Sequence, residues 1–285
     1  MPPVITGVRK GGVQLRKYFW VLLGLFFFTG NVFAEQVVVE REVRALPQSE
    51  REPLKKFGVD TFYEYSWIKQ AGRHILWKTG LMHLSYNMDG LSPYVEVLSY
   101  DRDHLKDETI ELGAYGKWKD GVVHAALGYG TQDADFVYKF QAALGYEHRL
   151  IKNLTWKVDY RFVDYKVNDA NIISPGLVYY FGNSYGVLEY GSSLIEKRGL
   201  AQWGALKANF YLNRLLDFSL GTAVGERLYD IADTLSAGEE YGYIFFCGLR
   251  FKMGDDKSFR IGYSYAKEKP SFLKRGVDLT FSLKF

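Results

Sequence analysis

Residues 154–165, LTWKVDYRFVDY, decide the fold. Apolar or aromatic side chains stand at every second position from Leu154 to Phe162, and the positions between them are polar or charged. A period of two is the period of a β-strand, because successive side chains of a strand point to opposite faces. The stretch therefore predicts a strand with one apolar face and one charged face.

The same alternation recurs along residues 57–285, where it predicts fourteen strands. Large aromatics alternate with Gly, Ala, Ser, Lys and Asp, as expected when one face meets lipid and the other lines a polar interior. A sheet in hydrocarbon must close on itself, because lipid offers its backbone amides no partners. We therefore expect an all-β protein, a transmembrane antiparallel up-and-down β-barrel of about 14 strands. The predicted strands are 57–67, 74–86, 92–100, 108–118, 122–130, 136–148, 154–165, 172–181, 185–194, 200–212, 215–226, 239–253, 258–267 and 275–285.

The links between these strands alternate in length. Outer-membrane barrels have short turns on the periplasmic side and longer external loops. We expect compact periplasmic turns at 87–90, 119–121, 152–153, 182–184, 213–214 and 254–257. We expect generally longer external links, including 101–106, 166–171, 195–199, 226–237 and 267–273.

The last strand carries a further local signal. A polar residue, a glycine and alternating apolar residues lead to a terminal aromatic: Lys274, Gly276, Leu279, Phe281 and Phe285. This pattern resembles the C-terminal recognition strand of bacterial outer-membrane barrels. We expect Gly276, Leu279, Phe281 and Phe285 to form an assembly signal for the outer-membrane assembly machinery.

The N-terminal segment has the pattern of an export signal. Basic residues between Arg9 and Lys17 precede an apolar run at 18–28, which is shorter than the ~20 residues of a spanning helix. Small residues near Ala34 suit a cleavage site. We expect a signal peptide at 1–34 and a flexible, charged periplasmic lead at 35–56. The predicted location is the bacterial outer membrane.

Aromatic residues make up 17% of the chain, which is consistent with a membrane protein. Rings near strand ends favour the membrane–water interface. On this basis we expect an interfacial girdle, whereas Tyr115 and Trp203 are candidates to face the lumen and stack on sugars. The expected girdle residues are Trp67, Trp77, Trp118, Trp156 and Tyr179.

The charged residues of the inward phase are the candidate functional residues. They carry both signs, so they could form a selectivity lining for permeating solutes or a paired network that fills the lumen. The candidate lumen-lining residues are Lys157, Asp159, Arg161, Glu189, Lys207, Asp217, Arg250, Lys252, Arg260 and Asp278.

Other chemistries have weaker support in the sequence. A net charge of +3 gives no footprint for nucleic acid, and the single cysteine, Cys247, forms no intramolecular disulfide. The five histidines are dispersed and match no catalytic pattern. Neither His104 with its flanking aspartates nor the acidic segment 226–240 has convincing metal-ligand spacing. We expect no enzyme activity, no metal and no cofactor.

The region 57–285 resembles the YaiO-type outer-membrane β-barrel family. The resemblance rests on 156–165, on 171–182 with its Tyr-Tyr-Phe-Gly ending, and on the glycine-rich segment 221–226. It implies a barrel of the outer membrane and, for members with helical repeats ahead of the barrel, a place in envelope or polysaccharide assembly. This chain has only a short lead in that position.

Together these patterns favour a passive pore or an envelope or exopolysaccharide assembly component. The alternatives are a non-conducting structural or adhesion barrel and, with less support, a lipid-modifying enzyme. The partners we expect are outer-membrane lipids, the assembly machinery, and small solutes or glycans.

Overall fold

The computed structural model describes residues 56–70, 72–102, 105–131, 137–166, 168–196, 199–226, 241–268 and 272–285. All of them lie in one compact unit, Val32–Phe285. The predicted signal peptide and almost all of the predicted lead lie outside the described residues, as do 227–240. Within the described residues, no helix is long and apolar enough to cross a membrane.

The described residues form fourteen strands. Long strands suit this sequence because β-branched and aromatic residues recur with a period of two. The strands are β1 (Phe57–Gln70), β2 (Arg73–Tyr86), β3 (Leu91–Arg102), β4 (Leu105–Trp118), β5 (Gly121–Gly130), β6 (Phe140–Ile151), β7 (Leu154–Asp164), β8 (Asp169–Phe181), β9 (Ser184–Ile195), β10 (Gly199–Asn213), β11 (Leu216–Glu226), β12 (Tyr241–Lys252), β13 (Lys257–Glu268) and β14 (Phe272–Lys284).

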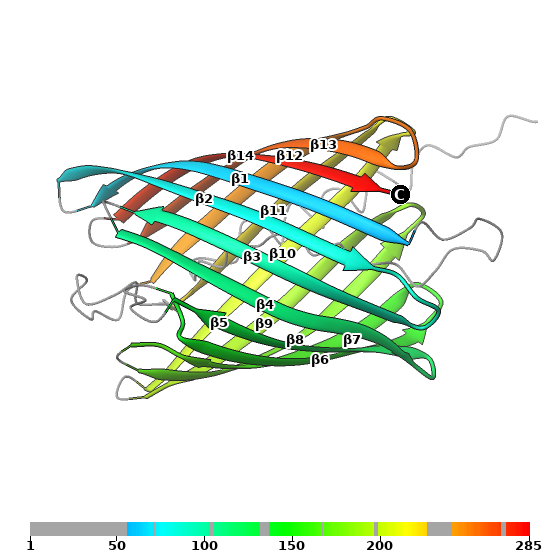
Figure 1. Cartoon of the computed structure of the whole chain (residues 1–285), viewed down its shortest axis with the longest axis horizontal. Coiled ribbons are helices and arrows are strands. Elements are labelled where there is room, and N and C mark those ends of the chain that lie inside the picture. The colour runs from blue at the N-terminus through cyan, green and yellow to red at the C-terminus, as the bar shows by residue number, and fades with distance from the viewer. Residues whose placement is uncertain are drawn as a thin grey trace, which may run out of the picture. The chain divides into compact units, whose positions relative to one another are not determined.

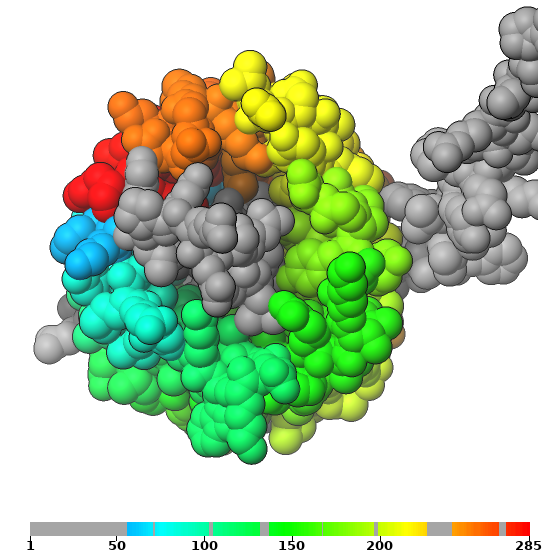
Figure 2. Space-filling model, turned by 90° about the vertical axis from the view of Figure 1, so that its right-hand side faces the viewer, coloured from blue at the N-terminus to red at the C-terminus, as the bar shows by residue number. Residues whose placement is uncertain are grey.

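Each strand pairs antiparallel with its neighbours in sequence, and β1 pairs with β14, so the sheet is a closed barrel (Figure 1). Figure 2 looks along the barrel, where the first strand, in blue, lies beside the last, in red. Closure leaves no sheet edge, which is the condition for backbone hydrogen bonding in hydrocarbon. The predicted closed antiparallel barrel of fourteen strands is confirmed.

The two faces of the wall differ in burial and polarity. On β9, Glu189 is 6% exposed, whereas its neighbours Leu188 and Tyr190 are 57% and 48% exposed. In a closed barrel the buried phase is the inner one, so Glu189 points inward and the apolar side chains point outward. The same alternation runs through β11, where every second residue from Asp217 to Gly225 is buried.

The turns are short, as predicted, at the barrel end where β1 begins and β14 ends. Residues 119–120 join β4 to β5 and residues 182–183 join β8 to β9. Gly182 has φ +69, a left-handed conformation that glycine adopts without steric cost. The links at the opposite end are shorter than predicted in five of the seven hairpins. The strands of these hairpins extend further than predicted, so that only residues 71–72, 103–104, 165–168, 196–198 and 269–271 separate them. The predicted links 101–106, 166–171, 195–199 and 267–273 shorten accordingly.

The start of β6 and the direction of Trp77 also differ from prediction. β6 begins at Phe140, not at 136, and Tyr138 packs against the buried cluster of Val163, Ala170 and Ile172. Trp77 was predicted to lie in the interfacial girdle, but it is 7% exposed and packs inside with Ile68 and Phe272. The other four predicted girdle residues belong to the outward phase, with Trp67 and Trp118 at 52% and 60% exposed.

The end of the chain completes the barrel. Phe57 and Phe285 exchange both backbone hydrogen bonds, with N–O distances of 2.9 and 3.0 Å, and their rings stack with centroids 5.9 Å apart. Leu279 and Phe281 point outward at 42% and 41% exposed, whereas Gly276 is buried. The residues of the predicted assembly signal therefore also form the closing rungs of the sheet.

Candidate functional site

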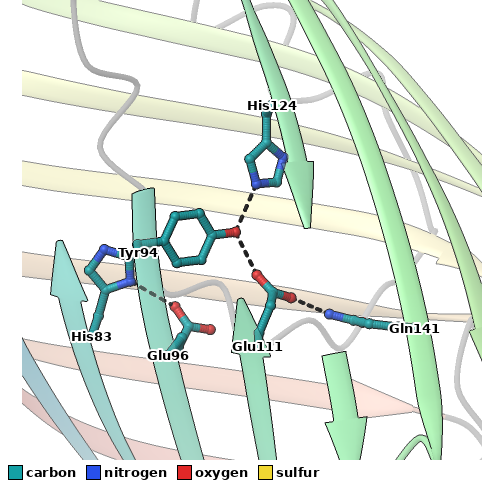
Figure 3. Close-up of polar contacts among 6 residues, drawn as sticks. All are labelled: His83, Tyr94, Glu96, Glu111, His124 and Gln141. Atoms are coloured by element: carbon teal, nitrogen blue, oxygen red, sulfur yellow. Dashed lines mark hydrogen bonds and ion pairs between the residues drawn. The ribbon is translucent and has the colours of Figure 1, made fainter. Parts of the chain in front are cut away.

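A cluster of polar and aromatic side chains lies on the inner wall of five consecutive strands, β2 to β6. We call it the inner polar cluster, and Figure 3 shows its six members. They are His83, Tyr94, Glu96, Glu111, His124 and Gln141. Most of them are almost completely buried, with Glu96 at 6% and Glu111 at 2% exposed.

Glu111 is the centre of this cluster. The Tyr94 hydroxyl donates to Glu111 Oε1 at 2.6 Å, and Gln141 Nε2 donates to Glu111 Oε2. The Tyr94 hydroxyl also lies 2.8 Å from His124 Nε2. Because the hydroxyl proton is directed at Glu111, Nε2 of His124 is the donor in this second bond. Donors from two strands, β3 and β6, thus hold the carboxylate of Glu111 on the wall, and His124 of β5 holds the Tyr94 hydroxyl in place.

A second carboxylate stands beside the first. Glu96 on β3 is the cross-strand partner of Glu111 on β4, and His83 Nδ1 lies 3.2 Å from Glu96 Oε2. Two like charges directly opposite each other are unfavourable unless donors surround them. Each carboxylate has its own donors here, so the wall holds a paired acidic site.

Aromatic rings cover this part of the wall. Tyr94 lies 4.9 Å from the ring of His83, and His124 lies 4.4 Å from the ring of Tyr115. Tyr115 and Trp203, the predicted lumenal aromatics, both belong to the buried phase of their strands. Flat aromatic rings next to carboxylates combine stacking surfaces with hydrogen-bond acceptors.

Three inner-wall glycines allow the rings to lie along the wall. A Cβ at Gly113 would meet the ring of Tyr94, one at Gly191 would meet Trp203, and one at Gly221 would meet Phe246. In each case the glycine is the cross-strand partner or near neighbour of the ring on the adjacent strand, a pairing that lets an aromatic side chain fold over a glycine. The rings therefore cover the wall instead of projecting across the lumen.

Gly113→Ala is expected to destabilise the barrel by about 1–3 kcal/mol, because the added methyl overpacks the wall against Tyr94. The measurement is urea unfolding of the folded protein in detergent. Gly116→Ala is the matched control on the same strand, where the nearest atom to a new Cβ is Leu91 Cδ1 at 3.9 Å. Equal midpoints for the two variants would contradict the packing of Tyr94 over Gly113.

All ten predicted lumen-lining residues lie in the inward phase, and the structure brings most of them into ion pairs or cross-strand rungs. Lys157 contacts Glu189 at 2.6 Å and Asp159 at 3.3 Å. Lys252 pairs with Asp217 at 2.8 Å, and Arg260 with Asp278 at 3.0 Å. The remaining three are placed by the strand register. Arg161 faces Ala143, and Lys207 faces Gly221. Arg250 faces Asp217 on one side and Arg260 on the other.

Sequence reasoning missed the inner polar cluster and a second network at the seam where the barrel closes. Glu64 on β1 accepts from Ser66 at 2.9 Å and Ser264 at 3.2 Å, and it pairs with Lys274 at 3.2 Å. Glu64 is 7% exposed and Lys274 is 8% exposed. The signal available in the sequence was the inward phase of Glu64, Glu96 and Glu111.

Charges of opposite sign gather on different sectors of the inner wall. Carboxylates dominate on β3 and β4, at Glu96, Asp107 and Glu111. Three cations, Arg250, Lys252 and Arg260, lie on β12 and β13, which are opposite β5 and β6 in the ring of fourteen strands, and Lys252 and Arg260 are paired there with Asp217 and Asp278. The inner wall therefore carries charges of both signs, which act on charged or dipolar solutes.

Within the described part of the chain, no group of three or more His, Cys, Asp or Glu residues could hold a metal ion. The described histidines of the inner wall contact Glu96 and Tyr94. The predicted weak candidates at 103–104 and 227–240 lie outside the described residues.

No family model matches the chain, and no curated protein of similar sequence was found. The structure is similar to solved outer-membrane barrels. The CymD monoaromatic hydrocarbon channel has a TM-score of 0.60 at 8% identity, covering 82% of this chain and 89% of that one. The toluene transporter TodX of P. putida has a TM-score of 0.57 at 7% identity, with 81% and 90% covered.

A bacterial polysaccharide outer membrane secretin has a TM-score of 0.54 at 9% identity, covering 82% of this chain and all of that one. At these identities the similarity establishes the fold, which is that of outer-membrane β-barrels.

Proposed function

We propose that the protein is a passive pore of the bacterial outer membrane for small polar solutes, with sugars as the class best suited to its inner wall. The observation that carries the proposal is the inner polar cluster. Its carboxylates place negative charge in the wall of the lumen, and the half-buried ring of Tyr115 beside the cluster offers a flat face on which a sugar can stack. Exposed apolar side chains outside and charged side chains inside support a location in a membrane.

The charged wall argues against a hydrocarbon as solute. An apolar molecule passing Glu96, Lys157 or Arg260 would displace water from charged groups without replacing its hydrogen bonds. The fold shared with hydrocarbon channels is therefore compatible with a different solute class. A more specific form of this proposal is a role in exopolysaccharide or envelope assembly, as implied by the resemblance to the YaiO-type family. The proposal includes no enzyme activity.

Purified, folded protein is expected to show discrete single-channel openings in planar bilayers. The double variant Glu96→Gln/Glu111→Gln is expected to shift the reversal potential in a salt gradient towards the anion side, because it removes negative charge from the wall. Glu108→Gln is the matched control: Glu108 lies on the same strand as Glu111 but in the exposed, outward phase.

A non-conducting barrel is the second candidate, and the burial of several inner side chains favours it. Val178 and Ser193 are 0% exposed, and Val163 is 1% exposed. If the folded protein shows no openings, the pore proposal is wrong and the non-conducting barrel takes its place. If the double variant conducts with the same ion selectivity as wild type, the inner polar cluster does not line the conduction pathway.

A further inference from the structure

A basic patch lies on the outer face of four adjacent strands, at the barrel end opposite the start of β1 and the end of β14. We call it the rim patch: Lys69 on β1, His74 and Lys78 on β2, Lys267 on β13, and Arg275 on β14. All except Lys78 are exposed. Lys78 is paired with Asp101 at 3.6 Å, and its side chain is 41% exposed.

The strand register brings these residues together. Lys69 faces His74 across β1 and β2, and both Lys69 and Lys267 face Leu273 from opposite sides. Arg275 lies two positions along β14 from Leu273. Neighbouring strands are ~4.8 Å apart, so the Cα atoms of these residues on β13, β14 and β1 lie within about 10 Å of one another across the wall.

The rim patch belongs to one sector and is not a general property of this end. On the outer phase of β7 and β8, Asp164 and Asp169 face each other in the terminal rung. Glu226 ends β11 in the same phase and accepts from the Tyr241 hydroxyl at 3.0 Å. The outer rim is therefore acidic on β7, β8 and β11 and basic on β13, β14, β1 and β2, with Asp101 of β3 paired to Lys78.

The position of the rim patch along the strands indicates the headgroup level of the membrane. On β1 the outward residues run Tyr63 (46% exposed), Tyr65 and Trp67 (52% exposed), and then Lys69. Aromatic rings followed by a cation mark the passage from hydrocarbon to headgroups. The short turns, the start of β1 and the end of β14 mark the opposite end as periplasmic, which places the rim patch at the outer leaflet.

Exposed cations at this spacing repel one another unless an anion lies between them. Because they face lipid and not the lumen, the complementary anion is a membrane component. We infer that the rim patch binds the phosphate groups of a phosphorylated glycolipid in the outer leaflet. This inference rests on the proposed outer-membrane location, and it is independent of whether the lumen conducts.

The test is a titration of folded, full-length mature protein in detergent with diphosphoryl lipid A, followed by native mass spectrometry. The triple variant Lys69→Ala/Lys267→Ala/Arg275→Ala is expected to bind about a hundredfold more weakly, from roughly one kcal/mol per cation near a charged lipid surface. The charge-matched control is Lys152→Ala/Arg214→Ala/Lys257→Ala, which removes three exposed cations near the periplasmic end.

Several results would overturn the inference: equal affinity of the rim variant and wild type, an equal loss in the control variant, or undiminished binding of dephosphorylated lipid. Displacement of the lipid by inorganic phosphate at equal concentration would assign the rim patch to free phosphate instead. Single-channel recordings of the rim variant are expected to match wild type, so a failure of the lipid site and a failure of the pore give different results.

Discussion

Glu64→Ala is expected to lower the free energy of unfolding by about 3–5 kcal/mol, the cost of removing one partner of a buried ion pair. Glu64 lies at the seam where β1 meets β14, and its carboxylate contacts Lys274, Ser66 and Ser264. The variant deprives a buried ammonium of this counter-charge and both hydroxyls of this acceptor. Urea unfolding in detergent and the heat-induced mobility shift on gels measure the effect.

Two further variants separate charge from packing at this seam. Glu64→Gln keeps an acceptor for the serines but loses the charge, so an intermediate loss is expected. Replacing both partners, as in Glu64→Met/Lys274→Met, is expected to recover much of the stability, because no charge is then left buried. A double variant no more stable than Glu64→Ala would show that the ion pair does not account for the loss.

Phe285→Ala is expected to abolish most assembly in cells while leaving the barrel able to refold in detergent. The substitution keeps the backbone hydrogen bonds with Phe57 and removes only the stacked ring, which contributes about 0.5–1.5 kcal/mol. A large loss of assembled protein with a small loss of stability therefore points to recognition by the assembly machinery. Membrane fractionation and in vitro refolding are the two measurements.

Deletion of Phe285 and a matched aromatic variant complete this experiment. The deletion also removes both hydrogen bonds to Phe57, so it is expected to slow refolding as well as assembly. Phe259→Ala removes an outward ring that faces Phe281 across β13 and β14, and it is expected to assemble normally. If Phe259→Ala assembles as poorly as Phe285→Ala, the terminal ring is not a specific signal.

The sequence by itself determined the number of strands, their order and, for most of them, which residues face outward. Those properties follow from a local period of two and from turn residues, so they can be read within ten or so positions, as at 154–165. Trp77 was misassigned because β2 carries apolar residues in both phases, with Ile75 and Leu81 on one side and Leu76 and Leu84 on the other.

Only the tertiary structure decided which inward residues meet. Glu64 and Lys274 are separated by 210 positions, and Tyr94 meets Glu111 and His124 from three different strands. These contacts depend on the closure of the barrel and on the stagger between strands. The stagger adds up from one strand pair to the next around the whole sheet. A local pattern gives the face on which a charge lies, but its partner is fixed by the geometry of the closed barrel.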